Sequence, residues 1–291
     1  MSQPADNPKR LIIITGPTAS GKTAQAIELA RMLHTEIVSC DSRQCYAELR
    51  IGVARPSDEE LAAVPHHFIA CRSVEQPYNV YDYEQEAMAC LARLFQQHDE
   101  VVAVGGSGLY VEALCQGVAQ LPDPAPGLRA YLQQQYEARG ISFLQEELRR
   151  LDYEYFCRVD TCNPIRMQRA LEVCITAGRP YSQLIAEQQQ LRRPRPFGIE
   201  VRVTKPDTAE LRRRVNARVD QMMAQGLFDE VCSLWHLRHL NTLNTVGYRE
   251  FFAYDTPERA QASLPAIAEQ IKLSTWHYAK KQMTWCNKRY A

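Results

Sequence analysis

The stretch GPTASGKT, residues 16–23, places two glycines, a lysine and a threonine at a spacing that binds phosphate groups. Gly16 and Gly21 allow backbone N–H groups to close around an anion, and a helix that begins at the loop adds partial positive charge. Lys22 would contact the phosphate as a cation, and Thr23 would ligate Mg²⁺. The loop therefore predicts a site for a phosphorylated ligand, whether or not a nucleoside is attached to it.

Two further groups of side chains could act on such a ligand. Asp41 ends an apolar run and could accept a proton or orient a nucleophile, although a helix cap formed with Ser42 explains its position equally well. Arg214 and Arg218 share a helix face, where their repulsion costs about 0.2–0.5 kcal/mol unless an anion lies between them. This spacing fits phosphate binding, and two solvated arginines would show it as well.

The apolar run VVAVGG, residues 101–106, lacks a feature that phosphate-loop ATPases usually have. Such a strand commonly ends in an acid that holds Mg²⁺, whereas this one ends in Gly105 and Gly106. An ordinary ATPase is therefore disfavoured. With Ser107, the two glycines suit the close approach of a ligand or a base, and a tight turn is the alternative.

The elements that must position these residues alternate between apolar runs and helical patterns. Such alternation predicts an α/β fold with a parallel sheet, helices on both faces and a phosphate-loop NTPase-like core. Ligands bind beyond the carboxyl ends of parallel strands, so the loop, Asp41 and the Gly-Gly segment should meet there. The predicted strands are residues 10–15, 36–40 and 101–106, and the predicted helices are residues 23–34 and 84–98.

Two proline-rich segments indicate a second domain. LPDPAPG (121–127) precedes a helical pattern, RRPRPFG (192–198) closes it, and a strand-like run, IEVRVT, follows. We therefore expect a helical insertion in an α/β core. The expected core comprises residues 1–124 and 197–291, and the expected insertion comprises residues 125–196.

Composition predicts a soluble cytoplasmic protein that does not bind membranes. The 291 residues are 45% hydrophobic, but no apolar run approaches the length that crosses a bilayer, and the N-terminus lacks the apolar segment of a secretory signal. No pair of the ten cysteines has C-x-x-C spacing, which favours reduced, buried thiols over a zinc site.

The charge is balanced overall but unevenly distributed. Residues 1–128 carry 9 Lys and Arg against 16 Asp and Glu, whereas residues 129–291 carry 25 against 18, which favours a polyanionic partner. The stretch WHYAKKQMTWCNKRY, residues 276–290, interleaves cations with aromatic rings, as nucleic-acid-binding segments do. An amphipathic helix with its tryptophans in the core would show the same pattern.

Several motifs follow one another in a family-specific order. They are GPTASGKT (16–23), DSRQ (41–44), IGVARP (51–56), VPHHF (64–68), VGGSGLY (104–110), RMQRALEV (166–173), GLFDEV (226–231), VGYREF (246–251) and YAKKQMTW (278–285). Together they resemble the tRNA dimethylallyltransferases from Leu11 to Trp285.

The resemblance implies a reaction and its partners. A dimethylallyl group would move from dimethylallyl diphosphate to N6 of the adenosine 3′-adjacent to a tRNA anticodon, releasing pyrophosphate. The phosphate loop would then hold an isoprenoid diphosphate with Mg²⁺, and the helical insertion would bind the anticodon stem-loop. We expect the chain to act as a monomer.

The resemblance also implies roles for individual residues. Asp41 would take the proton from N6, and Thr18 would lie near the reacting atoms. The expected diphosphate-binding residues are Gly16, Thr18, Ala19, Ser20, Gly21, Lys22, Thr23 and Arg218, with Thr23 on the metal. The expected tRNA-binding residues are Asp41, Ser42, Arg43, Gln44, Ser107, Arg129, Ile165, Arg166, Met167, Gln168, Arg169, Thr245, Val246, Gly247, Tyr248, Arg249 and Glu250.

The chain departs from the family pattern at a few positions. Ser107 and Asn163 stand where the family usually has Thr and Asp, Val53 and Arg55 change IGTAKP to IGVARP, and Lys281 replaces an Arg. These departures affect expected tRNA contacts rather than the core chemistry.

Three other functions stay open from the sequence. A phosphate-loop small-molecule kinase would need a purine site and a lid with transferring arginines. An enzyme that prenylates free AMP or ADP would need neither the helical insertion nor the basic tail. An RNA-binding module without catalysis would not need a complete phosphate loop.

Overall fold

The structure is a computed structural model that describes residues 9–191 and 194–290. The chain forms two units: a sheet unit, from residues up to Gln116 and from Arg195 on, and a helical unit, Gly117–Pro194. The helical unit thus begins eight residues earlier and ends two residues earlier than the segment 125–196 expected from the sequence.

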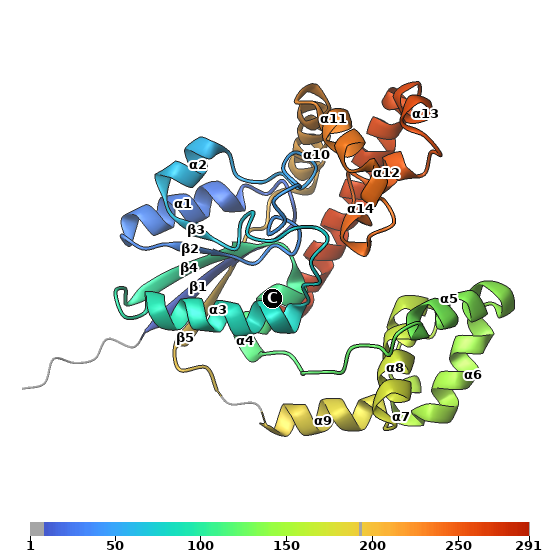
Figure 1. Cartoon of the computed structure of the whole chain (residues 1–291). Coiled ribbons are helices and arrows are strands. Elements are labelled where there is room, and N and C mark those ends of the chain that lie inside the picture. The colour runs from blue at the N-terminus through green and yellow to red at the C-terminus, as the bar shows by residue number, and fades with distance from the viewer. Residues whose placement is uncertain (1–8, 192–193, 291) are drawn as a thin grey trace, which may run out of the picture. The chain divides into compact units, whose positions relative to one another are not determined.

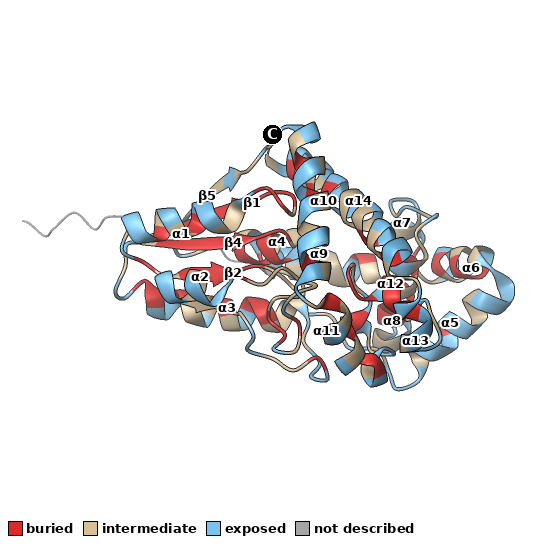
Figure 2. Ribbon diagram, turned by 90° about the horizontal axis from the view of Figure 1, so that it is seen from above, coloured by how far each residue is buried: buried red, intermediate tan, exposed pale blue. Residues whose placement is uncertain are grey.

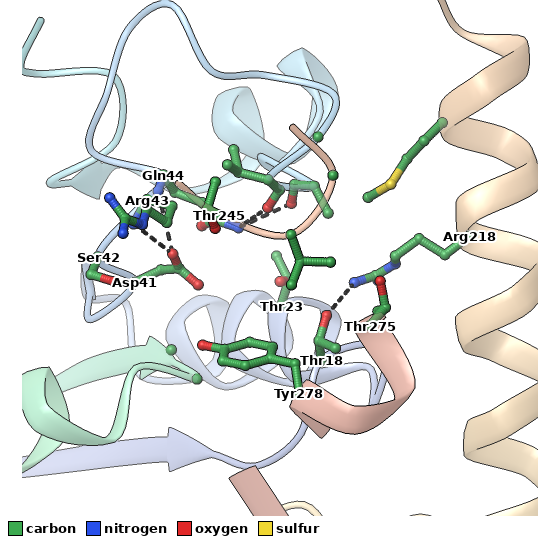
Figure 3. A pocket seen from close by; sticks show the side chains of 18 of the residues that line it. Thr18, Thr23, Asp41, Ser42, Arg43, Gln44, Arg218, Thr245, Thr275 and Tyr278 are labelled. Carbon is green, nitrogen blue, oxygen red and sulfur yellow. Dashed lines mark hydrogen bonds between the residues drawn. The ribbon is translucent and has the colours of Figure 1, made fainter. Parts of the chain in front are cut away.

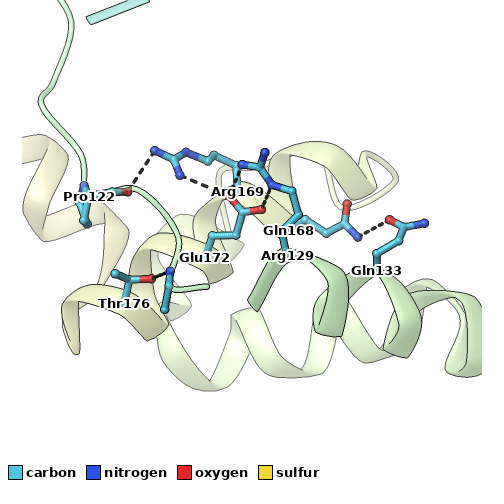
Figure 4. Close-up of polar contacts among 8 residues, drawn as sticks. Pro122, Arg129, Gln133, Gln168, Arg169, Glu172 and Thr176 are labelled. Carbon is cyan, nitrogen blue, oxygen red and sulfur yellow. Dashed lines mark hydrogen bonds and ion pairs between the residues drawn. The ribbon is translucent and has the colours of Figure 1, made fainter. Parts of the chain in front are cut away.

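Polar contacts explain where these boundaries lie. Arg195 Nη2 donates to Glu84 Oε1 at 2.7 Å, which ties the second boundary to the sheet unit. Arg169 Nη2 donates to the carbonyl of Pro122 at 3.4 Å, so the first proline-rich segment belongs to the helical unit (Figure 4). The prolines of the segment 121–127 therefore lie within the helical unit and do not mark its border.

A five-stranded parallel sheet in the order β3-β2-β4-β1-β5 forms the centre of the sheet unit (Figure 1). Ile12 of β1 lies opposite Val102 of β4 and Glu200 of β5. Four strands match the predicted runs, whereas the two-residue β3 was not predicted. The strands are β1 (Arg10–Thr15), β2 (Ile37–Ser39), β3 (His66–His67), β4 (Glu100–Gly105) and β5 (Gly198–Val203).

Helices cover both faces of this sheet. Helices α1 and α2 lie over one face and α3 and α4 over the other (Figure 1), with the buried residues on the strands and on the inner sides of the helices (Figure 2). The predicted fold class is confirmed. These helices are α1 (Lys22–Met32), α2 (Asp58–Ala63), α3 (Val80–Leu94) and α4 (Gly108–Gln116).

Within the described residues, five further α-helices complete the sheet unit, and two of them, α10 and α14, pack on the phosphate loop. Ala19 of the loop shares a buried cluster with Leu211 and Val215 of α10 and with Ala279 of α14. This cluster holds α10 and α14 beside the loop. The helices are α10 (Thr208–Ala224), α11 (Leu227–Ser233), α12 (Arg249–Phe252), α13 (Pro257–Gln261) and α14 (Leu264–Tyr290).

The helical unit has a core of its own, built around Leu132, Leu144 and Leu171. Asn163 caps α8, because its side chain accepts a hydrogen bond from the backbone N–H of Arg166 at 3.2 Å. The departure at position 163 therefore preserves the helix cap. The helices are α5 (Leu128–Arg139), α6 (Ile141–Leu151), α7 (Tyr153–Phe156), α8 (Pro164–Ala177) and α9 (Tyr181–Leu191).

Two expectations from composition can be compared with the fold. Within residues 9–191 and 194–290, no helix combines the length and the apolar character that crossing a bilayer requires. All ten cysteines are free thiols, but only four are buried and three are exposed. The expectation of buried cysteines therefore holds only in part.

Candidate active site

A cavity of about 420 Å³ lies in the sheet unit beyond the carboxyl ends of the strands. Its wall includes the phosphate loop after β1, Asp41 after β2 and the Gly-Gly segment after β4, together with residues of α10 and α14 (Figure 3). The predicted meeting of these three segments is thus confirmed.

The phosphate loop turns sharply between β1 and α1 because three of its residues have positive φ. Gly16 has φ 144° and Gly21 has φ 86°, while Ala19 has φ 62°. A Cβ atom at position 16 would lie 2.7 Å from the carbonyl oxygen of Thr204, so only glycine fits there. The side chains of Ala19 and Ser20 are buried outside the cavity, which leaves their backbone for an anion.

Two partly buried cations, Lys22 and Arg218, face the cavity. Burial lowers the pKa of Lys22 to about 8; the Asp41 carboxylate raises that pKa, and Arg218 lowers it further. Burial also lowers the pKa of Arg218, whose Nη1 donates to Thr18 Oγ1 at 3.4 Å. Lys22 Nζ donates to the Pro17 carbonyl at 2.5 Å. Desolvated cations beside a phosphate loop form a site prepared for an anion.

Only one arginine of the predicted pair reaches the cavity. Arg218 lines it, whereas Arg214 Nε forms an ion pair with Glu210 Oε1 at 2.6 Å. Four residues along a helix amount to about 6 Å, which places Arg214 one turn away from the cavity. The prediction that both arginines share one anion is therefore wrong for this cavity.

The surroundings of Asp41 fit both interpretations of its position, a backbone cap and a proton acceptor. Its Oδ1 accepts hydrogen bonds from the backbone N–H groups of Arg43 at 2.9 Å and Gln44 at 3.3 Å, which caps a turn rather than a helix (Figure 3). Its Oδ2 has no hydrogen-bond partner among the described residues. One oxygen thus fixes the carboxylate, and the other can accept a proton from a ligand.

The residues after Asp41 connect three loops. Ser107 Oγ accepts from the Ser42 backbone N–H at 2.9 Å and donates to Ser42 Oγ at 3.1 Å. Gln44 Nε2 donates to the carbonyls of Val53 at 3.2 Å and Ala54 at 3.0 Å. Serine at position 107 therefore keeps the hydroxyl contact that a threonine would make, and the change at position 53 leaves its backbone contact intact.

Both glycines of the Gly-Gly segment line the cavity, and close packing from the other side also requires them. A Cβ atom at position 105 would lie 2.3 Å from the Cys40 carbonyl, and one at position 106 would lie 2.4 Å from Gln282 Nε2. Gln282 Nε2 donates to the Gly106 carbonyl at 2.8 Å, and its Oε1 accepts from the Thr18 N–H at 2.8 Å. Gln282 thereby joins β4 to the phosphate loop, a role that the sequence did not indicate.

The predicted tRNA-binding segment 245–250 divides into two groups. Thr245, Val246, Gly247 and Arg249 line the cavity. Tyr248 is fully buried, and its hydroxyl donates to Glu230 Oε1 at 2.6 Å. Glu250 is also buried and accepts from the backbone N–H of Gly247 at 2.9 Å. The side chains of Tyr248 and Glu250 thus support the segment and are not available to RNA, which corrects the expectation for them.

Two of the predicted tRNA-binding residues of the helical unit, Arg129 and Arg169, contact the buried carboxylate of Glu172 (Figure 4). Arg129 Nε pairs with Glu172 Oε1 at 2.6 Å, and Arg169 Nη1 lies 3.3 Å from Glu172 Oε2. Burial raises the pKa of Glu172, but the hydrogen bond and charge of Arg129 outweigh it and lower the pKa overall. Gln168 Nε2 donates to Gln133 Oε1 at 2.9 Å.

Three other predicted residues lie at the start of α8. Ile165 and Arg166 are exposed, whereas Met167 is fully buried in the core of the helical unit. Successive side chains of an α-helix point about 100° apart, so Met167 faces the core although Arg166, the residue before it, is exposed. The side chain of Met167 therefore cannot contact RNA, which corrects the expectation for it.

One wall of the cavity is apolar and was not anticipated from the sequence. Apolar residues at helical spacing, as on α10 and α14, usually indicate a helix face that is buried in the core. The sequence pattern therefore does not show that some of these side chains line a cavity. Thr275 and Tyr278 of α14 add hydroxyl groups to the same wall (Figure 3). The apolar lining residues include Val53, Ile69, Val219, Met222 and Ile271.

The donor groups present fit Mg²⁺ held largely by a substrate. Thr23 and Asp41 line the cavity, and Asp41 is the one carboxylate that does so within the described chain. Mg²⁺ in phosphate sites commonly takes one or two protein oxygens and completes its shell with phosphate oxygens and water. The structure therefore offers ligands for a substrate-bound ion rather than a protein cage.

The fold and the cavity define a class of protein: an α/β enzyme whose phosphate loop borders a cavity with two partly buried cations, one carboxylate among the described residues and apolar lining residues. The family model described as IPP transferase matches residues 44–289, and the chain belongs to this family. The predicted family is thus confirmed.

Relatives with known names support this assignment. The tRNA dimethylallyltransferase 1 of Bacteroides thetaiotaomicron is 45% identical over 276 residues, which cover 94% of this chain and 87% of the relative. The crystal structure of the full-length tRNA isopentenylpyrophosphate transferase from Bacillus halodurans is 28% identical, with a TM-score of 0.65, and covers 97% of this chain and 88% of that one. A eukaryotic dimethylallyltransferase acting on tRNA, 22% identical with a TM-score of 0.77 over 96% and 70% of the two chains, shares the fold.

Proposed function

We propose that the protein transfers a dimethylallyl group from dimethylallyl diphosphate to N6 of the adenosine 3′-adjacent to the anticodon of tRNA. The observation that carries this proposal is the cavity in which the partly buried, desolvated cations Lys22 and Arg218 lie with Asp41 beside apolar lining residues. The names of the relatives as tRNA dimethylallyltransferases support it.

The diphosphate binds at the phosphate loop. Backbone N–H groups of residues 16–23, Lys22 and Arg218 stabilise its charge, and Thr18 is positioned between Arg218 and Gln282 to contact it. Mg²⁺, held by Thr23 together with the diphosphate, would neutralise part of the charge that develops on the leaving group. The leaving pyrophosphate therefore departs into a strongly cationic site.

The dimethylallyl group lies against the apolar wall. Val53, Val219 and Met222 offer a surface without charges, so the allylic carbon is kept from water and from hydrolysis. In the transfer, the bond between the allylic carbon and the diphosphate oxygen breaks, and its electron pair leaves with pyrophosphate. A bond from N6 to the same carbon forms.

Asp41 handles the proton of this step. The exocyclic amine is a weak nucleophile because its lone pair is delocalised into the purine ring. Asp41 Oδ2 accepts a hydrogen bond from N6 and takes its proton as the new bond forms, while Oδ1 stays bound to the turn. The adenosine must leave its stack to enter the cavity.

The tRNA contacts the cavity mouth and the helical unit. Ser42, Arg43, Gln44, Thr245 and Arg249 belong to the loops around the cavity, and Arg129, Arg166 and Ile165 present exposed side chains in the helical unit. The helical unit binds the anticodon stem-loop in this proposal. The protein acts as a monomer in the cytoplasm, where tRNA is found. Basic residues exceed acidic ones, 15 to 10, in residues 195–291, which suits a polyanionic substrate.

The proposal is tested by a comparison of acceptors. Labelled dimethylallyl diphosphate and Mg²⁺ are incubated with the protein and either unmodified tRNA or AMP, and the nucleosides are separated after digestion. Incorporation into tRNA and none into AMP is expected. Incorporation into AMP alone would assign the protein to adenylate prenylation, and incorporation into neither acceptor would contradict the proposal.

A further inference from the structure

A second cavity, of about 440 Å³, lies in the sheet unit at the end of β5, next to the phosphate loop. Ser20 of the loop lines this second cavity. Thr18, Lys22 and Thr23 line the first cavity, that of the candidate active site, which we call the transfer cavity. One loop therefore borders both cavities. No carboxylate lines the second cavity among the residues that the structure describes. We refer to it as the β5 cavity.

Three cationic side chains surround the β5 cavity: Arg202, Lys205 and Arg214. Arg202 Nε pairs with Glu200 at 2.6 Å, and Arg214 Nε pairs with Glu210 at 2.6 Å. Both guanidinium groups use only Nε in these contacts, so the edge formed by Nη1 and Nη2 stays without a partner in the described chain. That edge binds an oxyanion with two parallel hydrogen bonds.

The acids next to this cluster do not neutralise it. Glu200 is shared between Arg202 and Arg10, and Glu210 is shared between Arg214 and Arg213. Lys205 makes no ion pair with any described residue. The β5 cavity therefore keeps an excess of positive charge.

Neutral donors complete the lining. Ser20 is 3% exposed, and its Oγ has no hydrogen-bond partner in the described part of the chain. Buried hydroxyl groups rarely lack a partner, so this one indicates a ligand. The Oε1 atom of Gln25 accepts from Thr204 Oγ1 at 3.1 Å, which leaves the amide NH₂ group as a further donor.

We propose that the β5 cavity binds a phosphate group, separately from the diphosphate of the transfer cavity. Cationic and neutral donors without a competing carboxylate are the surroundings that phosphate oxygens require. The phosphate belongs either to a phosphodiester of the RNA substrate or to a free polyphosphate anion. Its RNA source rests on the proposed function, whereas its free-anion source does not.

The test uses one double variant and a matched control. Arg202→Ala/Lys205→Ala removes two cations from the β5 cavity, and Arg93→Ala/Arg259→Ala removes two exposed cations that line neither cavity and do not contact Glu200 or Glu210. Thermal unfolding of each variant is compared with that of the wild type. Arg202 lies on β5, so its substitution changes a strand residue as well as a charge. Every measurement is therefore repeated with the single variant Lys205→Ala, which changes only the loop after β5.

Two binding measurements, both independent of catalysis, separate the sources. For an RNA phosphodiester, the cavity variant binds unmodified tRNA about tenfold more weakly than the control, and its slope of log Kd against log salt concentration is smaller by about one to two. For a free anion, calorimetry finds two pyrophosphate sites per chain in the wild type and control, and one in the cavity variant.

Equal tRNA affinity of the cavity and control variants, together with one pyrophosphate site in every protein, would overturn the proposal. Failure of the proposed function has a different signature, because wild-type protein would then transfer no dimethylallyl group to tRNA. The two binding results would still decide whether the β5 cavity holds phosphate.

Discussion

Lys22 shows how single residues set the chemistry of the transfer cavity. Desolvation lowers the pKa of its ammonium group to about 8, and the Asp41 carboxylate is the largest of the influences that oppose this shift. A bound diphosphate adds negative charge next to the ammonium group and favours its protonated form. Ligand binding and protonation of Lys22 are therefore linked.

This linkage predicts proton uptake at alkaline pH. At pH 9 most free protein carries a neutral Lys22, so binding of dimethylallyl diphosphate without tRNA should take up part of one proton. Affinity for the diphosphate should fall as the pH rises above about 8. Calorimetry at pH 9 in buffers of different ionisation enthalpy measures the uptake. Lys22→Arg, which stays charged, should show none, and zero uptake by the wild type would contradict the assignment.

Asp41 allows a substitution that separates its two oxygens. Asp41→Asn keeps an oxygen for the N–H groups of Arg43 and Gln44 but replaces the proton acceptor with an NH₂ group. The single-turnover rate should fall roughly 100- to 10,000-fold, while the affinity for dimethylallyl diphosphate and the melting temperature stay close to wild type. An undiminished rate would remove Asp41 from proton transfer.

At the scale of elements, β4 and α14 position the phosphate loop through Gln282. The two glycines after β4 exist because the backbone of Cys40 and the side chain of Gln282 approach them closely. The sequence suggested a ligand or a base at this place, and both glycines line the transfer cavity, but packing against them was not predicted. It could not reveal the true neighbours, because β2 and α14 reach the glycines only through tertiary packing.

The two glycines should respond differently to substitution. In Gly105→Ala the new methyl group meets rigid backbone of Cys40, so the free energy of unfolding should fall by about 3 kcal/mol or more. In Gly106→Ala it meets the movable end of Gln282, so stability should fall less, while the rate of transfer drops because the contact with Thr18 is disturbed. Urea unfolding and transfer assays measure both effects. Equal losses of stability would contradict this distinction.

Elements with strong local patterns were predictable, and those that depend on packing were not. The apolar runs of β1, β2, β4 and β5 and the loop before α1 are visible in the sequence. β3 consists of two histidines and forms only because β2 offers a free edge. Motif resemblance located Tyr248 and Met167 near RNA, but only the structure shows that both side chains are buried.

At the scale of the whole molecule, the sheet unit contains the complete transfer cavity and the helical unit has a separate core. The two units should therefore have separate roles in substrate binding. Changes at the predicted tRNA-binding residues on the surface of the helical unit should affect RNA binding and leave diphosphate binding unchanged.

Arg166 tests this separation of roles. Its side chain is exposed at the start of α8, so Arg166→Ala should weaken tRNA binding about three- to tenfold and reduce the salt dependence by about one unit of slope. The KM for dimethylallyl diphosphate should not change. Arg158→Ala, an exposed arginine of the same unit paired with Glu154, is the control. Equal effects of the two variants would contradict a specific role for Arg166.

The central claim is that one cavity joins the allylic carbon of the diphosphate to N6 of a single adenosine. Mass spectrometry of ribonuclease fragments, after incubation of an unmodified tRNA with dimethylallyl diphosphate and Mg²⁺, tests it most directly. We expect one dimethylallyl group on the adenosine 3′-adjacent to the anticodon and a strongly reduced yield with Asp41→Asn. Unmodified tRNA, or dimethylallyl groups at other positions, would contradict it.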